Sequence, residues 1–263
     1  MIKLLFHKFA SCFGYRSHFV PKGQLVFVCY VRKRSAAIFI AAVIALFVIN
    51  AIGVNLSAPQ SQPVFQPEPP IMRGNTAKKC VSITVNIDWG EEYLPEMLAI
   101  LKENHTSATF FITGRWAENN GPLVRRIARQ GHEIGNHGFS HPHVNNLSLD
   151  ENIKEIQQTE NILYQLTGRH TRFFAPPYGE YNETVLDAAN KSNLQTVLWS
   201  IDTVDWQNPA PDWIITRVRN MAYSGAIILM HPTPVTIKVL PEIIKTLSGQ
   251  GYEIVSLEKL LSE

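Results

Sequence analysis

Four histidines lie within twelve residues near the middle of the chain, in the sequence GHEIGNHGFSHPH. Two of them, His137 and His141, are four residues apart, which in a loop or a helical turn lets two imidazoles reach one metal ion. A third, acidic ligand would leave a coordination position for water, and Asp88 is the best-placed acid for that role. The spacing therefore favours a divalent-metal site. The alternative is a surface loop that binds no metal.

A second candidate pair lies nearer the C-terminus. His231 ends the apolar sequence AIILMHP, so we expect it half-buried at the mouth of a buried strand. There an imidazole can titrate near neutral pH and act as a general acid, and Asp205 is a candidate to orient it and raise its pKa. The alternatives are a packed structural histidine and a carboxylate that caps a loop. Four aromatic residues near the same strand ends could stack on sugar rings or pack in the core: Trp89, Tyr178, Trp199 and Trp206.

The elements that must position these side chains alternate between strand and helix. Expected strands lie at 81–87, 108–112, 132–135, 172–174, 196–199, 226–230 and 252–255. Expected helices lie at 94–103, 121–130, 148–168, 182–191, 211–223 and 240–247. This alternation implies a parallel sheet with helices outside, either a barrel or a doubly wound sheet. Each candidate polar residue follows the end of a different strand, and in a β/α barrel those ends converge on the face that holds the active site.

The N-terminal part of the chain is expected to lie outside this domain. Residues 1–34 carry seven Lys and Arg and no acid, and residues 35–56 are almost entirely apolar. The apolar segment is long enough to cross about 30 Å of hydrocarbon and follows a basic triplet, which places the rest of the chain outside the cytoplasm. A membrane anchor is favoured over a cleaved signal sequence, which would release a secreted domain. Residues 57–79 contain five prolines and predict a semi-rigid linker, so the domain is expected over 80–263.

Composition excludes several classes of protein. With 45% apolar and 17% charged residues, the chain is too apolar for disorder and too mixed for a polytopic membrane protein. The whole chain carries +2, so once the +7 of the N-terminal segment is set aside the rest carries −5, which does not favour nucleic-acid binding. Only one of three cysteines, Cys80, lies beyond residue 56, which excludes a disulfide scaffold and a cysteine zinc cluster. Nothing indicates oligomerisation, and we expect a monomer.

Five motifs in order resemble the NodB-homology polysaccharide deacetylases, carbohydrate esterase family 4. They are Asp88-Trp-Gly, His137-x3-His141-Pro, Ala-Pro-Pro-Tyr178-Gly, Asp202-x2-Asp205-Trp206 and Leu-Met-His231. The resemblance covers about residues 80–255. The combination of NIDWGEE with ILMHPT looks most like the sporulation-associated branch found in spore-forming Gram-positive bacteria.

The resemblance implies a distorted (β/α) barrel and a hydrolase that removes N-acetyl groups from peptidoglycan or chitin-type chains. It implies a divalent metal, most often zinc, held by an acid and the two histidines, with a second acid as the base that activates water. The oxyanion would be stabilised by the metal and by the backbone N–H of Tyr178. His231 would protonate the departing amine and Asp205 would tune it, with Pro177 and Trp206 beside the substrate.

The first motif departs from the family's pattern. The family carries two adjacent acids, roughly T-F-D-D-G, whereas this chain has a single acid between Thr84 and Gly90. Aligned on Gly90, Asp88 is the base and Trp89 replaces the metal-binding acid. Aligned on Thr84, Asn86 replaces the base and Asp88 binds the metal. Strand alternation puts Asn86 and Asp88 on one face, so both registers stay open.

A second departure is Ala175, which stands where the family has an arginine that orients the base. Arg172 lies three residues earlier, and a surface role is expected for it. Both departures affect the base and the metal acid, whereas the histidine pair and the general acid are intact. Two functions therefore stay open: a metal-dependent deacetylase, which we favour, and a degenerate, membrane-tethered carbohydrate-binding domain with little or no turnover.

Overall fold

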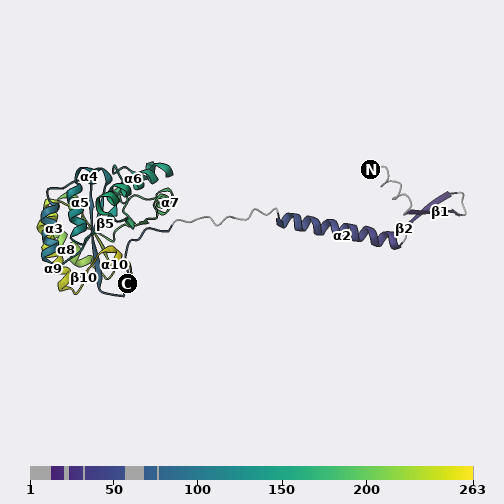
Figure 1. Ribbon diagram of the computed structural model, residues 1–263. Coiled ribbons are helices and arrows are strands. Elements are labelled where there is room, and N and C mark those ends of the chain that lie inside the picture. Colours follow the sequence, from purple (N-terminus) through teal and green to yellow (C-terminus); the bar gives the residue numbers. More distant parts are fainter. Residues whose placement is uncertain (1–12, 21–23, 32, 57–67, 76, 263) are drawn as a thin grey trace. The chain divides into compact units, whose positions relative to one another are not determined.

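The computed structural model describes residues 13–20, 24–31, 33–56, 68–75 and 77–262 (Figure 1). Its contacts divide the chain into two units, Met1–Val64 and Phe65–Glu263.

The first unit contains a hairpin and a helix. Strands β1 (Phe13–Val20) and β2 (Gln24–Val31) pair antiparallel, and α2 spans Lys33–Leu56. The hairpin was not expected, because its sequence shows no regular alternation of apolar and polar residues. Among the residues that the structure describes, no helix has both the length and the apolar character needed to cross a membrane. The membrane segment at 35–56 stays a prediction.

The second unit is built on one parallel sheet of eight strands. Along the sheet the order is β7-β6-β5-β4-β3-β9-β8, and β10 also pairs with β3. The strands are β3 (Cys80–Ile87), β4 (Thr109–Ile112), β5 (Glu133–Asn136), β6 (Phe173–Phe174), β7 (Gln195–Thr196), β8 (Ile201–Asp202), β9 (Ile227–Met230) and β10 (Glu253–Ile254). Neighbours in this order follow one another along the chain as in a barrel, and within residues 68–262 the ends β7 and β8 do not pair. The fold is therefore an open, distorted (β/α) barrel rather than a doubly wound sheet.

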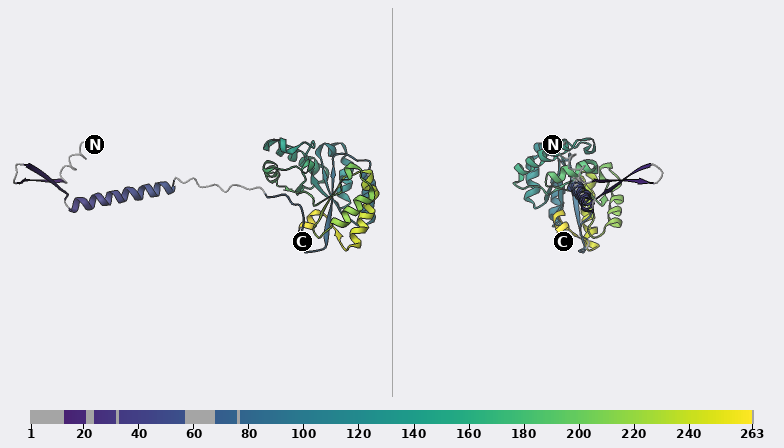
Figure 2. Two further views of the ribbon diagram at one scale, coloured as in Figure 1. Left: turned by 180° about the vertical axis from the view of Figure 1, so that it is seen from behind. Right: turned by 90° about the vertical axis from the view of Figure 1, so that its right-hand side faces the viewer.

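Helices surround the outer face of the curved sheet: α9 packs against α3 and α8, and α6 packs against α4, α5 and α7 (Figures 1 and 2). They are α3 (Leu94–Glu103), α4 (Gly114–Asn119), α5 (Gly121–Arg129), α6 (Leu149–Thr167), α7 (Glu183–Lys191), α8 (Pro211–Met221), α9 (Pro234–Gly249) and α10 (Leu257–Ser262). The expected capping box of α6 is present, with Ser148 and Glu151 each accepting from the other's backbone N–H.

Three helices differ from the sequence-based expectation. Short α4 and α10 were not expected. Helix α9 begins six residues before the predicted start, because the Thr233 side chain caps it and Pro234 occupies its first turn, where a missing N–H costs nothing. Buried side chains along the first two turns, including Val235 and Val239, outweigh the low helix propensity of β-branched residues.

Strand β3 is the central element, and all eight of its residues are buried. One face, with Val81, Ile83 and Val85, joins the main apolar cluster under the helices. Each such side chain contributes roughly 1.5–3 kcal/mol when fully buried. The other face carries Thr84 and Asn86 into the barrel interior, because successive side chains of a strand alternate. The strand thus anchors the core and delivers polar groups to the interior.

The domain includes part of the predicted linker 57–79. Ile71 forms a parallel bridge with Val197, and Arg73 forms an antiparallel bridge with Ala226. Ile71 also packs against a cluster of buried apolar residues in the barrel. The folded domain therefore begins before residue 80, while the part of the linker before residue 68 lies outside the described residues.

Candidate active site

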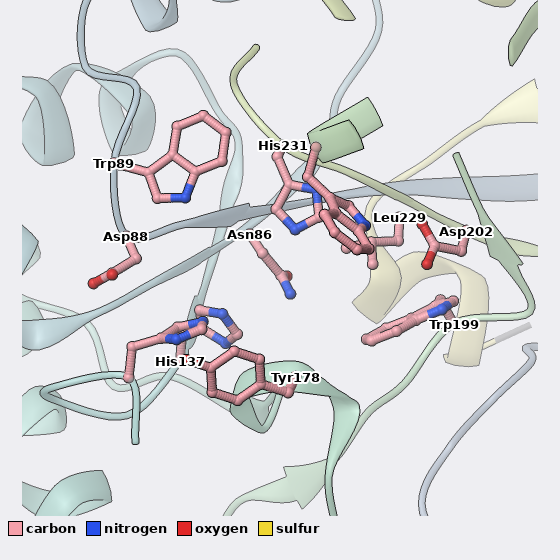
Figure 3. A pocket seen from close by; sticks show the side chains of 11 residues that line it. Asn86, Asp88, Trp89, His137, Tyr178, Trp199, Asp202, Leu229 and His231 are labelled. Carbon is pink, nitrogen blue, oxygen red and sulfur yellow. The ribbon is translucent and has the colours of Figure 1, made fainter. Parts of the chain in front are cut away.

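A pocket of about 300 Å³ lies at the C-terminal ends of the strands (Figure 3). It is lined by Asn86, Asp88, Trp89, His137, His141, Tyr178, Trp199, Asp202, Trp206, Leu229 and His231. Most of the residues singled out from the sequence therefore meet in one place, as the barrel geometry predicts. Asp205 and Pro177 are buried just behind the lining.

His231 and Asp205 form the predicted pair. The Nδ1 atom of His231 lies 2.8 Å from Oδ1 of Asp205, and the backbone N–H of His231 donates to Oδ2 at 2.6 Å. The hydroxyl of Thr236 also donates to Oδ2. Asp205 is 1% exposed, so its carboxylate is held by three donors in a buried position. With Nδ1–H bound to this carboxylate, Nε2 is the nitrogen that can exchange a proton with a ligand.

His137 and His141 come together as the spacing predicts, with ring centroids 5.0 Å apart. Nδ1 of His137 lies 2.6 Å from the carbonyl oxygen of Ala175, which fixes the proton on Nδ1 and leaves Nε2 with a free lone pair. Burial lowers the pKa of His137 from 6.5 to about 3, and burial also lowers the pKa of His141. Both rings are therefore neutral at pH 7, which is the form that ligates metals.

The loop that carries these histidines is held by side chains at its base. Asn136, the last residue of β5, accepts from the N–H of Gly138 at 2.9 Å and donates to a carbonyl of α6. Glu155 of α6 accepts from the N–H groups of Phe139 and Ser140, each at 2.8 Å. Because these contacts involve buried or half-buried groups, the loop is fixed before any ligand binds.

Asp88 lies beside this loop, but its carboxylate has other partners. The Thr113 hydroxyl donates to Oδ1 at 2.8 Å, and Nη2 of Arg115 lies 3.4 Å from Oδ1 and 3.3 Å from Oδ2. In Figure 3 the Asp88 carboxylate points away from His137, whereas the amide of Asn86 points toward the centre of the pocket.

The residues present fit a divalent metal only in part. The two neutral imidazoles suit a metal as nitrogen ligands. Nowhere in the described ranges, however, do three His, Cys, Asp or Glu side chains gather closely enough to hold one ion. The predicted ligand set of His137, His141 and Asp88 is thus not assembled, and the role of Asp88 as a ligand stays a prediction.

Comparison with known proteins agrees with this arrangement of motifs. A family model described as polysaccharide deacetylase matches residues 73–197. The peptidoglycan-N-acetylmuramic acid deacetylase PdaA of Bacillus subtilis is 31% identical over 195 residues, which cover 72% of this chain and 74% of that protein. The chain belongs to the polysaccharide deacetylase family.

Two other proteins are more similar in sequence. The chain is 40% identical to the uncharacterized Bacillus subtilis protein YlxY over 75% of its own length, and it spans 62% of that relative. It is also 40% identical, with a TM-score of 0.72, to the solved structure of a CE4 family pseudoenzyme from Bacillus anthracis, covering 74% of this chain and 69% of that chain. A mutant of that pseudoenzyme has restored enzymatic activity.

The structure shows where Ala175 and Arg172 lie, the two residues of the second departure from the family's motifs. Ala175 is buried, and Arg172 forms a surface ion pair with Glu258, which agrees with the expected surface role. Sequence reasoning missed Arg115, the arginine that does contact Asp88. One signal could have found it: Thr113 directly follows β4, so the next residues also lie at the C-terminal face.

Aromatic side chains surround the mouth of the polysaccharide deacetylase pocket. Trp89, Tyr178 and Trp206 are 45%, 57% and 55% exposed, so they are available for stacking and do not belong to the core. Tyr178 adopts a left-handed φ of 59° and packs between His141 and His143, with centroid distances of 4.6 and 4.3 Å. This places the backbone of Tyr178 beside the histidine pair.

Proposed function

We propose that the chain hydrolyses N-acetyl groups of a peptidoglycan-type glycan, which releases acetate and leaves a free amine. The observation that carries the proposal is the Asp205–His231 pair, in which a buried carboxylate holds a half-buried histidine of the same pocket as the neutral His137–His141 pair. Relatives named as peptidoglycan deacetylases support this choice of substrate.

Breaking the amide C–N bond requires a proton for the departing nitrogen. His231 would supply it from Nε2, since Asp205 binds the opposite nitrogen and fixes the ring. Asp88, oriented by Thr113 and Arg115, is the carboxylate beside the pocket that would accept the proton of the attacking water. Sugar rings would stack on the exposed aromatic residues at the mouth.

The proposal includes a divalent metal, with zinc as the first choice. His137 and His141 would hold it as neutral nitrogen ligands, because burial keeps both rings unprotonated at pH 7. Such an ion, when bound, supplies a Lewis acid that polarises a carbonyl oxygen and lowers the pKa of water.

A second candidate function is glycan binding with little or no turnover. It is favoured by the contact of Arg115 with Asp88 and by the absence, among the described residues, of a three-ligand metal group. Similarity to a CE4 family pseudoenzyme supports it as well. The aromatic mouth would serve either function, so binding alone does not distinguish them.

One experiment separates the two candidates. The metal content of the full-length chain is determined by elemental analysis, and acetate released from chitooligosaccharides and peptidoglycan is measured with and without chelator. A deacetylase releases acetate in a chelator-sensitive way. His231→Ala then lowers the rate by about 10²–10⁴-fold while glycan binding survives. His170→Ala, at a surface histidine, is the matched control. Glycan binding without acetate release would instead establish the binding domain.

We further propose that residues 35–56 attach the chain to the membrane as a monomer, with the barrel on the extracytoplasmic side where peptidoglycan lies. The uncharged apolar segment after a basic triplet supports this. Fractionation of membranes, followed by protease treatment of intact cells, tests it.

A further inference from the structure

We propose that Arg115 is a positioning residue that withholds Asp88 from a metal ion bound by the histidine pair. His137 and His141 would then hold a divalent metal without a carboxylate ligand from Asp88. This inference rests on the metal-binding part of the proposed function, but it does not require turnover, because metal affinity is measured without glycan.

Both oxygens of Asp88 are engaged from the same side. Oδ1 accepts from the Thr113 hydroxyl and lies within reach of Arg115, while Oδ2 lies 3.3 Å from the same guanidinium nitrogen. In Figure 3 the carboxylate is turned away from His137. The Asp88 carboxylate is thus hydrogen-bonded to Thr113 and Arg115 and to neither imidazole of the pair.

The backbone fixes this arrangement. In the parallel pairing of β3 and β4, Ile87 lies opposite Ile112, so Asp88 and Thr113 are the next residues on adjacent strands. The N–H of Thr113 donates to the carbonyl of Ile87 at 3.0 Å. Strand register therefore keeps the backbones of Asp88 and Thr113 adjacent, whereas the hydrogen bond between their side chains can break when the Asp88 side chain rotates.

The backbone of Arg115 is tied to the loop that carries the histidine pair. The N–H of Gly114 donates to the carbonyl of Gly138 at 2.9 Å, and the N–H of Arg115 donates to the carbonyl of Phe139 at 3.0 Å. The start of α4 is thus anchored between the loop and Asp88. Because the anchoring uses the backbone, changing the Arg115 side chain leaves the loop in place.

The solvent exposure of Arg115 determines how strongly it holds Asp88, and therefore how much metal affinity should change when it is removed. The Arg115 side chain is 54% exposed, so its ion pair with Asp88 is screened by solvent and holds the carboxylate weakly. Protein zinc sites use three or four protein ligands, so a carboxylate added to two imidazoles strengthens binding. We expect metal affinity to rise about two- to fivefold when the guanidinium is removed.

The test is a titration of the full-length chain with Co²⁺ by visible absorbance and with Zn²⁺ by calorimetry. Arg115→Ala is expected to bind both metals about two- to fivefold more tightly than the wild type, with a changed Co²⁺ spectrum. The added substitution Asp88→Asn should remove the gain. Arg129→Ala, which removes the same charge from α5 without a contact to Asp88, should behave as the wild type.

Three results would overturn the proposal: Arg115→Ala binds metal no more tightly than the wild type, the gain persists when Asp88 is Asn, or Arg129→Ala gives the same gain. A thermal melt of each variant shows that it is folded. If Arg115→Ala gains affinity while no variant releases acetate, the inference stands and the proposed deacetylase activity fails.

Discussion

The two halves of the pocket differ in how completely their carboxylates are held. Asp205 is 1% exposed and binds three donors that belong to the same side of the barrel, including the histidine it serves. Asp88 is more exposed, and its partner Arg115 is a surface side chain that is 54% exposed. A buried, saturated carboxylate resists change, whereas an exposed one can exchange partners at little cost in stability. Both departures from the family's motifs fall in the half that contains Asp88.

The largest expected effect is the loss of stability when the buried carboxylate of Asp205 is removed. Asp205→Ala leaves the His231 backbone N–H and the Thr236 hydroxyl without their acceptor, so the free energy of unfolding should fall by about 3–5 kcal/mol. Asp88→Ala should cost less than about 1 kcal/mol. Urea unfolding monitored by tryptophan fluorescence measures both. Equal losses in the two variants would contradict the contrast between the halves.

A pH series tests a titrating group that lies outside both halves. Burial lowers the pKa of His132 from 6.5 to about 4. As pH falls from 6.5 to 4, the unfolded chain binds a proton that the folded chain does not, so stability is lost, up to about 3 kcal/mol. His132→Gln should flatten the decline of urea midpoints over that window. His170→Gln, at the surface, should leave the slope as it is in the wild type.

Restoring an acid to the half of the pocket that contains Asp88 tests whether a missing carboxylate limits metal binding and acetate release. The Asn86 side chain is buried and points toward the centre of the pocket. Asn86→Asp places a carboxylate beside the histidine pair, so we expect acetate release and Co²⁺ affinity to rise by about tenfold. Asn190→Asp, on α7, is the matched control. No change in either quantity would show that a missing acid is not what limits the pocket.

The smallest expected effect concerns the aromatic mouth, which both halves share. Trp206→Ala should weaken binding of chitooligosaccharides by about 1 kcal/mol, roughly fivefold, without altering the rate at saturating substrate. Trp213→Ala is the control, because this tryptophan is also exposed but lies on α8, outside the pocket lining. Isothermal titration calorimetry gives the affinities. A fall in the saturated rate would assign Trp206 to the chemistry instead.

Local signals predicted the elements with strong boundaries. The β-branched sequence of β3, the helix at Leu94–Glu103 and the capping box of α6 follow from neighbouring residues, and the structure confirms them. The strand at 196–199 was wrong in part. Only Thr196 of that range belongs to a strand, β7, and Val197 makes an isolated bridge with Ile71, while β8 at Ile201–Asp202 was not predicted.

The sequence predicted the site residues that closely follow the end of a strand. It did not predict side-chain partners that depend on tertiary contacts. His137, His141, His231 and Asp205 were predicted from their order, and they meet in or beside one pocket. The contact between Asp88 and Arg115 joins residues 27 positions apart and depends on the register of two strands, which no short-range pattern records.

A force applied to the chain on the N-terminal side of the barrel would first act on the bridge between Ile71 and Val197. Any pull on the chain from its N-terminal side reaches the domain through this short segment, at the edge where β7 and β8 do not pair. Under load the segment would peel away before the central strands lose a hydrogen bond. Trp199, which follows β7, lines both the groove beside this segment and the active-site pocket, so detachment of the segment would uncover a residue of the pocket wall.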